Sequence, residues 1–466
     1  MHAQETEENV GTITETISRW ASELRYEDLS LEAIDAAKRF LYDSVGCALG
    51  GYQTHDPRIV LEHLEEVGGT PVCTLFGSGA KSDPVRSAFA NSLMIRAMDY
   101  NDIYWKQDPS HPSDIIPAAT SLGERENLSG RDLIVGIVLG HEIEMRLCLV
   151  GVPGIRERGW HHATLTAFAS PVVASWMLRL PWQQMQHAIG ISASHCCSLG
   201  AVTAGKLTMM KNTVDPMATA AGVEAALLAK RGYSGPEHVL DGKEGLFHCL
   251  GEAWDPGQMT DGLGDRFLIV DCGMKAYPTE ALTHSPISAT LHIVREHNLQ
   301  AEEIEQVHIE SIARAADILS DPSKYEPDTK ETADHSLPYC IAAALVDHKV
   351  TPQQFTDEKI RDARLRAQLR KVKVTANEEF EKLFPAQQST RVTITTTSGQ
   401  KHERRVDMPK GDPRDPMTQE ELQIKFDALA EPVLSPERRA QLRDAIFALE
   451  KVERIADLMG LCVADR

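Results

Sequence analysis

Apolar residues recur at helical spacing from Thr12 to about Gly264. The segments ITETISRWASEL, SLEAIDAAKRFLYDSVGCAL and SAFANSLMIRAM each carry them three or four positions apart, which predicts amphipathic helices. Leu133–Val150 is apolar on most faces in its first half, so we expect a buried central helix there. Further helices are expected at Leu165–Leu180, at Trp182–Cys196 and in ATAAGVEAALLAKRGY. This part of the chain therefore predicts a large all-helical domain.

The pattern changes after Asp271. The segments IEQVHIES, LRKVKVTA, STRVTITTT and KHERRVDMP alternate in the manner of strands, and TSGQ between the last two predicts a hairpin turn. Helices are expected between the strands, at Ser288–His297 and Ser336–Val346. This region therefore predicts a smaller α+β domain.

Helical spacing returns from Thr418 to Met459, interrupted at EPVLSPE. These closing helices are expected to pack on the first domain, which makes the smaller domain an insertion. We therefore predict a mainly α fold, with a helical domain of residues 1–270 and 411–466 and an inserted α+β lid domain of residues 271–410.

Length and charge narrow the class of protein. A chain of 466 residues exceeds the size at which one core keeps growing, so two domains are expected. The net charge of -20 argues against nucleic acid and anionic membranes as partners, although local lysines can still bind an anionic substrate. The acidic N-terminus lacks the features of a signal or transit peptide, and no apolar stretch is long enough to span a bilayer.

The nine cysteines are scattered and show no zinc or cluster spacing. Free thiols in a reducing cytoplasm fit this distribution best. An iron–sulfur cluster is disfavoured, but cysteines that converge in space leave it open.

The polar segment MDYNDIYWKQDPSHPSD, at residues 98–114, is the first candidate site. It combines carboxylates with an imidazole, which suits acid–base chemistry or metal binding. Helix capping explains the same residues about equally well. The candidate residues are Asp99, Asp102, Asp108, His111 and Asp114.

Two further segments carry histidine or lysine beside helices. In RERGWHHAT, His161 and His162 precede an apolar helix, whose positive dipole end keeps an imidazole neutral. In GKLTMMKNT, Lys206 and Lys211 lie in a glycine-flanked segment and could hold a substrate carboxylate. Taken alone, a packed histidine or a solvated lysine is the commoner explanation.

The fourth candidate is CGMKAYPTEALTHSPIS, at the junction between the two domains. Lys275, Tyr277 and His284 flank Pro278 there, and domain junctions are favoured places for ligand clefts. A proline-bent linker with solvated polar residues explains the segment equally well.

These four segments, in this order, resemble the MmgE/PrpD family, as do YDSVGCALGG, GHEIEMRLC and TADHSLPYCIAAALVDHKVTPQQF. The resemblance covers nearly the whole chain. It implies a helical domain formed by both termini, an inserted lid, a metal-independent site between them and a homodimer. The family's site residues correspond here to Asp99, His111, His162, Lys211 and Lys275, with His284 after them.

Details of the motifs look more like the methylcitrate dehydratase branch of this family than its decarboxylase branch. The spacing from Asp99 to His111, the sequence HPSD and TADHSLPY point that way, and SIARAADI lacks the lid tyrosine of decarboxylase-like members. Other details depart from the dehydratases. Ile103 stands where many relatives have threonine, Met210 replaces an aromatic residue, and the region around Glu280 lacks an EYHAQ-like run.

The sequence therefore predicts a cofactor-free cytoplasmic hydro-lyase that converts 2-methylcitrate or citrate to the corresponding cis-aconitate. The alternative is a decarboxylase or epimerase acting on a related polycarboxylate, and a catalytically idle scaffold is a more distant rival. Lys211 and Lys275 are expected to hold substrate carboxylates, His111 and His162 to act as acid and base, and Asp99 to orient one of them. Substrate-binding roles are expected for Lys206, Tyr277 and His284. No metal, nucleic acid or membrane partner is expected.

Overall fold

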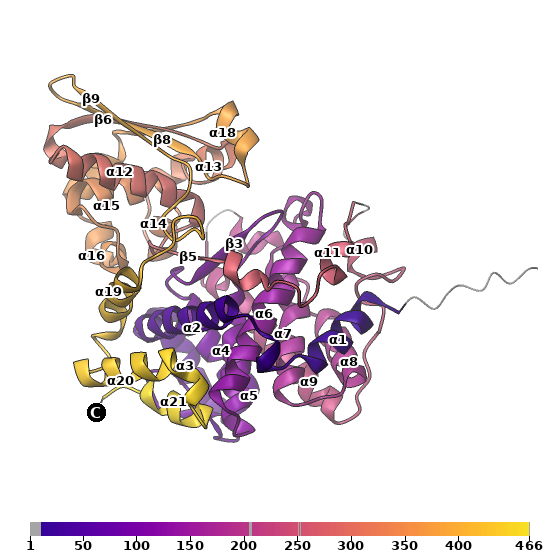
Figure 1. Ribbon diagram of the computed structural model, residues 1–466. Helices are drawn as coiled ribbons and strands as arrows, with labels where there is room; N and C mark the ends of the chain where they lie inside the picture. The colour runs from indigo at the N-terminus through magenta and orange to yellow at the C-terminus, as the bar shows by residue number, and fades with distance from the viewer. Residues whose placement is uncertain (1–10, 205–206, 250, 252, 466) are drawn as a thin grey trace, which may run out of the picture.

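Two hydrophobic cores organise the chain in this computed structural model, which describes residues 11–204, 207–249, 251 and 253–465. The larger core lies among the N-terminal helices and includes Phe426 and Leu458 of the closing segment. The smaller core lies beside a sheet near the C-terminal half and includes Val307 and Tyr339. Figure 1 shows the second part as a cap at one end of the helical part. The mainly helical fold with a C-terminal mixed-sheet region is confirmed.

The predicted central helix is α6 (Gly130–Val150), which is buried along almost its whole length. It begins where Ser129 Oγ accepts a hydrogen bond from the backbone N–H of Asp132 and the Asp132 side chain accepts one from Ser129. It packs against α5, α7 and α2. The other helices of this part are α1 (Ile13–Glu23), α2 (Leu31–Gly51), α3 (His55–Val67), α4 (Pro84–Arg96), α5 (Ile116–Arg125), α7 (Ala163–Met177), α8 (Trp182–Ala193), α9 (Met210–Lys230), α10 (Leu246–Cys249) and α11 (Gly257–Thr260). A short ribbon of β1 (Cys73–Thr74) and β2 (Lys81–Ser82) precedes α4.

The closing helices pack on the first part of the chain, as the sequence indicated. They are α19 (Gln419–Ala430), α20 (Pro436–Phe447) and α21 (Ile455–Leu461), drawn in yellow in Figure 1, where α19 lies to the left of α2 and the other two lie below it. Phe426 stacks on Tyr42 with ring centroids 4.1 Å apart. The buried Lys425 pairs with Asp43 at 2.7 Å, so α19 is joined to α2 by apolar and ionic contacts. The exact boundaries at residues 270 and 410 stay predictions.

The lid holds a four-stranded mixed sheet in the order β7-β6-β8-β9. Its strands are β6 (Ile304–Ser311), β7 (Val372–Ala376), β8 (Thr390–Thr396) and β9 (Lys401–Val406), each within a segment predicted as a strand. β6 and β7 are parallel, and the β8–β9 hairpin pairs Thr395 with Lys401 around the predicted turn. The sheet packs on α12 (His284–Glu296), beside which α15 (Leu337–Asp347) lies (Figure 1). The remaining lid helices are α13 (Ala313–Ile318), α14 (Lys330–Asp334), α16 (Asp357–Ile360), α17 (Ala363–Leu369) and α18 (Glu378–Leu383).

A second, three-stranded sheet lies where the two parts meet. It consists of β4 (Pro109–Ser110), β3 (Asp102–Trp105) and β5 (Gly273–Met274), in that order. The sequence analysis assigned no strand to the polar segment at residues 98–114, but the β-prone residues of β3 pair with the distant strand β5, with Asp102 opposite Met274. This pairing brings the domain junction against the polar segment.

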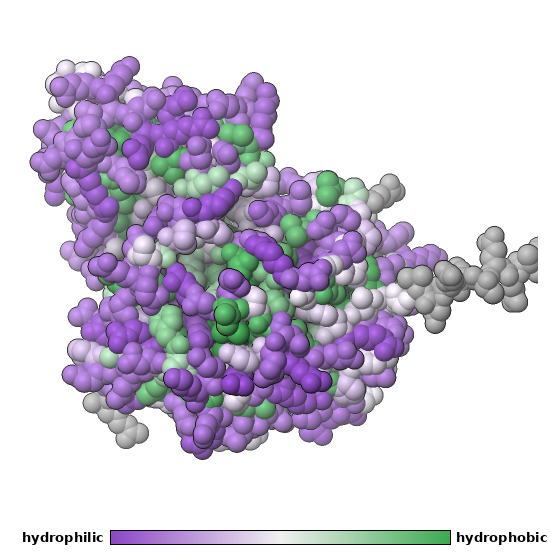
Figure 2. Space-filling view, in the orientation of Figure 1, coloured by the Kyte–Doolittle hydropathy of each residue, from purple (hydrophilic) through white to green (hydrophobic). Residues whose placement is uncertain are grey.

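Within the described ranges, no helix is long and apolar enough to cross a bilayer. Figure 2 shows a mainly hydrophilic face, with hydrophobic residues concentrated where the lid meets the helical part. The cytoplasmic location and the homodimer stay predictions of the sequence.

The closing helices should contribute measurably to stability. Phe426→Ala removes a side chain that is 1% exposed and stacked on Tyr42, so we expect a loss of ~3–5 kcal/mol in the free energy of unfolding. Urea denaturation followed by circular dichroism measures it. Ile424→Ala, at a position 62% exposed on the same helix, is the control and should change stability by less than about 0.5 kcal/mol. Equal effects of the two substitutions would contradict this packing.

Candidate active site

Asp99 lies at the centre of the candidate site, just after α4. Its backbone is left-handed, with a φ of 52°, a conformation that aspartate tolerates better than most residues but that still carries strain. The residue is 2% exposed. Such conformations concentrate at functional sites, where the surrounding contacts hold them in place.

Three buried cations surround the Asp99 carboxylate. Arg96 Nη1 is 2.6 Å from Oδ1, Lys275 Nζ is 2.8 Å from Oδ1, and Lys211 Nζ is 3.1 Å from Oδ2. Although burial acts to raise the pKa of Asp99, Lys211, Lys275 and Arg96 hold it well below its ordinary value. Burial lowers the pKa of Lys211 to about 8 and also lowers that of Lys275, with Asp99 acting in the opposite direction. A carboxylate is therefore required here to keep the cations charged.

The two lysines differ in their free hydrogen-bonding capacity. Lys275 Nζ donates to Asp99 Oδ1 at 2.8 Å, to the Asp99 carbonyl at 3.2 Å and to the Thr279 carbonyl at 3.1 Å, which uses its three donors. Lys211 Nζ faces Asp99 alone among the described residues within ion-pair distance. Lys275 therefore fixes Asp99 in place, whereas Lys211 has donors left for a ligand.

His111 is held in one tautomer by the backbone of β3. Its Nδ1–H donates to the Asp102 carbonyl at 2.6 Å, so Nε2 carries the lone pair of the neutral ring. Burial lowers the pKa of His111 well below its ordinary value, and the positive charge of Arg96 adds to this effect. His111 therefore presents a neutral imidazole. Its ring centroid is 5.3 Å from that of His162.

His162 lies beside a carboxylate on α9. Its Nε2 is 3.3 Å from Asp215 Oδ1, and its ring packs on His161 at 3.9 Å between centroids. Burial acts to raise the pKa of Asp215, but His162, His161 and Arg96 hold it well below its ordinary value. His162 also marks the start of α7, as the sequence predicted. The pair of His162 and an ionised Asp215 has the geometry of an oriented acid–base group.

Asp99, His111, His162, Lys211 and Lys275 line one space of about 90 Å³ between the helical part and the lid, which we call the inner cavity. A larger space of about 1160 Å³, the outer cleft, adjoins it, and the two share Arg156, His162, Thr203, Ile318 and Lys324. The ionisable residues that line the inner cavity are Arg96, Asp99, His111, Arg156, His162, Lys211, Lys275, Glu280, Lys324 and His335. The structure thus brings together Asp99, His111, His162, Lys211 and Lys275, whose catalytic roles stay predictions.

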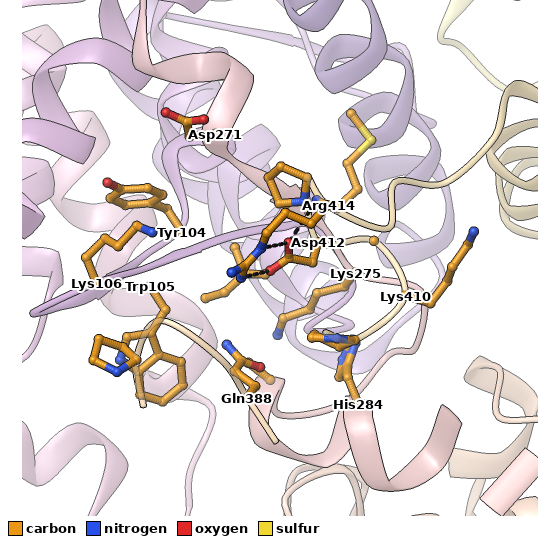
Figure 3. Close-up of a pocket in the computed structure, with 18 residues that line it drawn as sticks. Tyr104, Trp105, Lys106, Asp271, Lys275, His284, Gln388, Lys410, Asp412 and Arg414 are labelled. Atoms are coloured by element: carbon orange, nitrogen blue, oxygen red, sulfur yellow. Dashed lines mark hydrogen bonds and ion pairs between the residues drawn. The ribbon is translucent and has the colours of Figure 1, made fainter. Parts of the chain in front are cut away.

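Two of the three predicted substrate-binding residues lie elsewhere. Lys206 falls outside the described residues. His284 lines a neighbouring space of about 260 Å³ at the domain junction, the junction pocket, together with Lys410 and the Asp412–Arg414 ion pair (Figure 3). Tyr277 packs against the His284 ring, and its hydroxyl is 3.2 Å from Ser288 Oγ. Neither Tyr277 nor His284 lines the inner cavity.

The remaining acids of the polar segment position the backbone around the site. Asp102 Oδ2 accepts from the N–H of Ser113 at 2.9 Å, which is the capping role considered from the sequence. Asp108 accepts from the N–H groups of Ile155 and Arg156 and so fixes the short helix η3 (Ile155–Arg158). Asp102 and Asp108 therefore hold the backbone around the site in place through hydrogen bonds.

Sequence reasoning missed several residues of the inner cavity. Arg96 had a weak signal, because it lies on a predicted helix three positions before Asp99. Asp215, which faces His162 but does not line the cavity, was also missed, since it lies four positions after Lys211 and before the helix that the sequence predicted. Arg156 lies beside the histidine motif. Lys324 comes from the lid, on η8 (Pro322–Tyr325), and only tertiary structure brings it to the site.

Two groups of buried donors have the types of side chain that bind metals. They are His161, His162 and Asp215, and separately Asp102, His141 and Cys272. In the second group Asp102 Oδ1 and Oδ2 already accept from Ser113, and His141 Nδ1 donates to the Ile137 carbonyl. Hydrogen bonding therefore accounts for much of this geometry, and the metal-independent site stays a prediction.

Comparison with known proteins gives consistent matches along the chain. Residues 15–258 match the MmgE/PrpD N-terminal domain, and residues 277–451 match the MmgE/PrpD C-terminal domain. Cis-aconitate decarboxylase of Aspergillus terreus is 25% identical, over 96% of this chain and 95% of that protein. Cis-aconitate decarboxylase of Mus musculus is 26% identical, over 96% of this chain and 92% of that protein. 2-Methylcitrate dehydratase of Salmonella typhi is 25% identical, over 75% of this chain and 74% of that protein.

The site lies between a helical part and a lid, and it combines two neighbouring histidines with buried lysines. This combination defines an enzyme site suited to acid–base chemistry. The chain belongs to the MmgE/PrpD family. The chain is similar to both branches, but the expected preference for the dehydratases is not supported, because the decarboxylases align along nearly the whole chain and the dehydratase along three quarters of it. Short motifs such as HPSD carry less information than an alignment over the full length.

Removing the central carboxylate should destabilise the protein. Asp99→Asn leaves three buried cations without their shared counter-ion, so we expect a loss of ~3–5 kcal/mol at neutral pH, measured by urea denaturation. Because the folded-state pKa of Asp99 is depressed, this contribution is present above about pH 4 and is lost as the pH falls further. Asp412→Asn breaks a more exposed pair with Arg414 and should cost less than about 1 kcal/mol. A similar loss in both variants would refute the central role of Asp99.

Proposed function

We propose that this protein is a lyase acting on a tricarboxylate, and that its reaction is the decarboxylation of cis-aconitate or a close analogue. The observation that carries the proposal is the buried Asp99–Lys211–Lys275 cluster, which lines the inner cavity together with His111 and His162. The full-length likeness to two cis-aconitate decarboxylases supports the choice of reaction.

Three cations are available for the carboxylates of the substrate. Lys211 retains free donors inside the cavity. Arg156 lies at the shared wall of the cavity and the outer cleft and has no carboxylate within ion-pair distance in the described part of the chain. Lys324 comes from the lid, and its pairing with Asp321 is long, at 4.0 Å. A tricarboxylate would therefore connect the helical part to the lid.

The two histidines have different roles in the proposed reaction. In cis-aconitate, the bond between the methylene carbon and its carboxylate breaks, and carbon dioxide leaves. The electron pair of that bond forms a new terminal double bond, and the pair of the old double bond takes a proton at its far carbon. His162, whose Nε2 lies 3.3 Å from Asp215 Oδ1, donates that proton as the oriented acid of the pair. Neutral His111 accepts a hydrogen bond or proton through Nε2.

The same site could instead eliminate water from 2-methylcitrate. Two observations favour this second candidate, the sequence HPSD around His111 and the absence of a tyrosine from α13, whose Ile318 lines the cavity. In that reaction Nε2 of His111 would take the proton α to a carboxylate, and His162 would protonate the departing hydroxyl.

Product analysis distinguishes the two reactions. Purified protein is incubated separately with cis-aconitate and 2-methylcitrate, and carbon dioxide and the organic products are quantified by mass spectrometry. We expect carbon dioxide and a dicarboxylate from cis-aconitate. Water elimination from 2-methylcitrate without carbon dioxide would select the second candidate, and no turnover of either compound would refute the proposed function.

Substitution of His162 tests the proposed proton donor. His162→Asn should lower kcat by about 10²- to 10⁴-fold, the usual contribution of a positioned acid or base, with little change in thermal stability. His248→Asn alters an exposed histidine and serves as the control. Wild-type turnover in His162→Asn would exclude this role.

The charge of Lys211 predicts a pH dependence. The free enzyme needs protonated Lys211 to bind a carboxylate, and its pKa is lowered to about 8 by burial. kcat/KM should therefore fall as the pH rises through about 8, because deprotonation removes the positive charge. Lys211→Met should lower kcat/KM at every pH and abolish this alkaline decline, whereas exposed Lys243→Met should match the wild type. An alkaline decline that persists in Lys211→Met would assign it to another group.

A further inference from the structure

Glu280 is a carboxyl on the wall of the inner cavity that the proposed reaction leaves without a role. Its Oε2 accepts a hydrogen bond from the N–H of Leu282 at 2.7 Å, where it caps the short helix η6 (Ala281–Thr283). Its own N–H donates to the Asp334 carbonyl at 3.0 Å, which ties the backbone to α14. Oε1 has no hydrogen-bond partner among the residues that the structure describes. One oxygen is thus fixed and the other is free for a ligand.

The charged groups around Glu280 come from several elements. Lys275 follows β5, Arg156 lies on η3, and Asp99 follows α4. The other ionisable groups of the cavity wall are Arg96, His111, His162, Lys211, Lys324 and His335. Burial raises the pKa of Glu280, while Lys275 and Arg156 act in the opposite direction and Asp99 adds to the rise. Glu280 therefore holds a proton to higher pH than an exposed glutamate does.

A polyanionic ligand in this cavity would raise the proton affinity of Glu280 further. A substrate carboxylate close to an ionised Glu280 would repel it, and like charges at a few ångströms raise proton affinity strongly. A protonated carboxyl, in contrast, donates a short hydrogen bond to a carboxylate. Its free oxygen is the position from which that proton can be donated.

We propose that Glu280 takes up a proton from solvent when a polycarboxylate enters the inner cavity, and then donates a hydrogen bond from its carboxyl group to a carboxylate of the ligand. This inference rests on the proposed function, since it assumes a polycarboxylate substrate. Glu280 is then a substrate-binding residue that couples affinity to pH. It complements Lys211, which binds by charge.

Calorimetry with an unreactive ligand tests the inference without turnover. Propane-1,2,3-tricarboxylate is titrated into the full-length protein at one pH near neutrality, in buffers of different ionisation enthalpy, and the dependence of the heat on buffer gives the number of protons taken up. The histidines also contribute to this number, so the informative quantity is the difference between variants.

We compare wild type with Glu280→Gln, Glu280→Asp and, as a matched control, Glu296→Gln on the exposed face of α12. Glutamine can still cap η6 and donate a hydrogen bond but cannot titrate. We expect Glu280→Gln to bind the ligand with proton uptake reduced by up to about one proton. Its affinity should also fall less steeply with rising pH than that of the wild type. Glu280→Asp should retain most of the uptake, and Glu296→Gln should match the wild type.

The outcomes separate this inference from the proposed function. Equal proton uptake by wild type and Glu280→Gln, with both binding the ligand, overturns the role of Glu280 alone. Failure of the wild type to bind the tricarboxylate overturns the proposed substrate class and the role of Glu280 together. Should Glu280→Gln lower the melting temperature sharply, the comparison of wild type with Glu280→Asp decides: ligand binding with the proton uptake lost in this carboxyl-retaining variant would contradict the inference, and retained uptake would support it.

Discussion

The site depends on one interaction, the contact of Asp99 with three buried cations. Taking Arg96, Lys211 and Lys275 out of water is unfavourable unless a carboxylate faces them, and Asp99 contacts all three. The cations come from α4, α9 and the segment after β5, so the carboxylate joins parts of the chain that are far apart in sequence. Its left-handed backbone is a local cost that these contacts offset.

The arrangement also explains why the cavity suits an anion. Asp99 is shared among several cations, and Lys275 uses its three hydrogen-bond donors on Asp99 and Thr279. Lys211 and Arg156 keep unused capacity on the cavity wall, and Lys324 adds a cation from the lid. A ligand with several carboxylates would complete these interactions and hold the lid against the helical part. In the proposed function, selectivity between decarboxylation and dehydration would depend on which bond of the bound ligand lies beside His162.

Most of the fold could be predicted from the sequence, because local periodicity determines it. Leu133–Val150 was recognised as a buried helix, and the strands β6 to β9 were recognised from their alternation. The pairing of β3 with β5 could not be foreseen. The two strands are four and two residues long and lie far apart in the sequence, so neither produces a recognisable local pattern. The ordered motifs singled out five candidate site residues that the structure brings together, namely Asp99, His111, His162, Lys211 and Lys275. Residues that reach the cavity only through tertiary structure, such as Lys324 on the lid, carry no such signal.

The central claim is that Lys211 and the lid-side cations bind the carboxylates of a ligand in the inner cavity. The most direct measurement is a crystal structure of the protein with bound propane-1,2,3-tricarboxylate. The account predicts one ligand carboxylate within hydrogen-bond distance of Lys211 Nζ and another beside Arg156 or Lys324, with the Asp99–Lys275 contact retained. A ligand bound only in the junction pocket or in the outer cleft, away from Lys211, would contradict it.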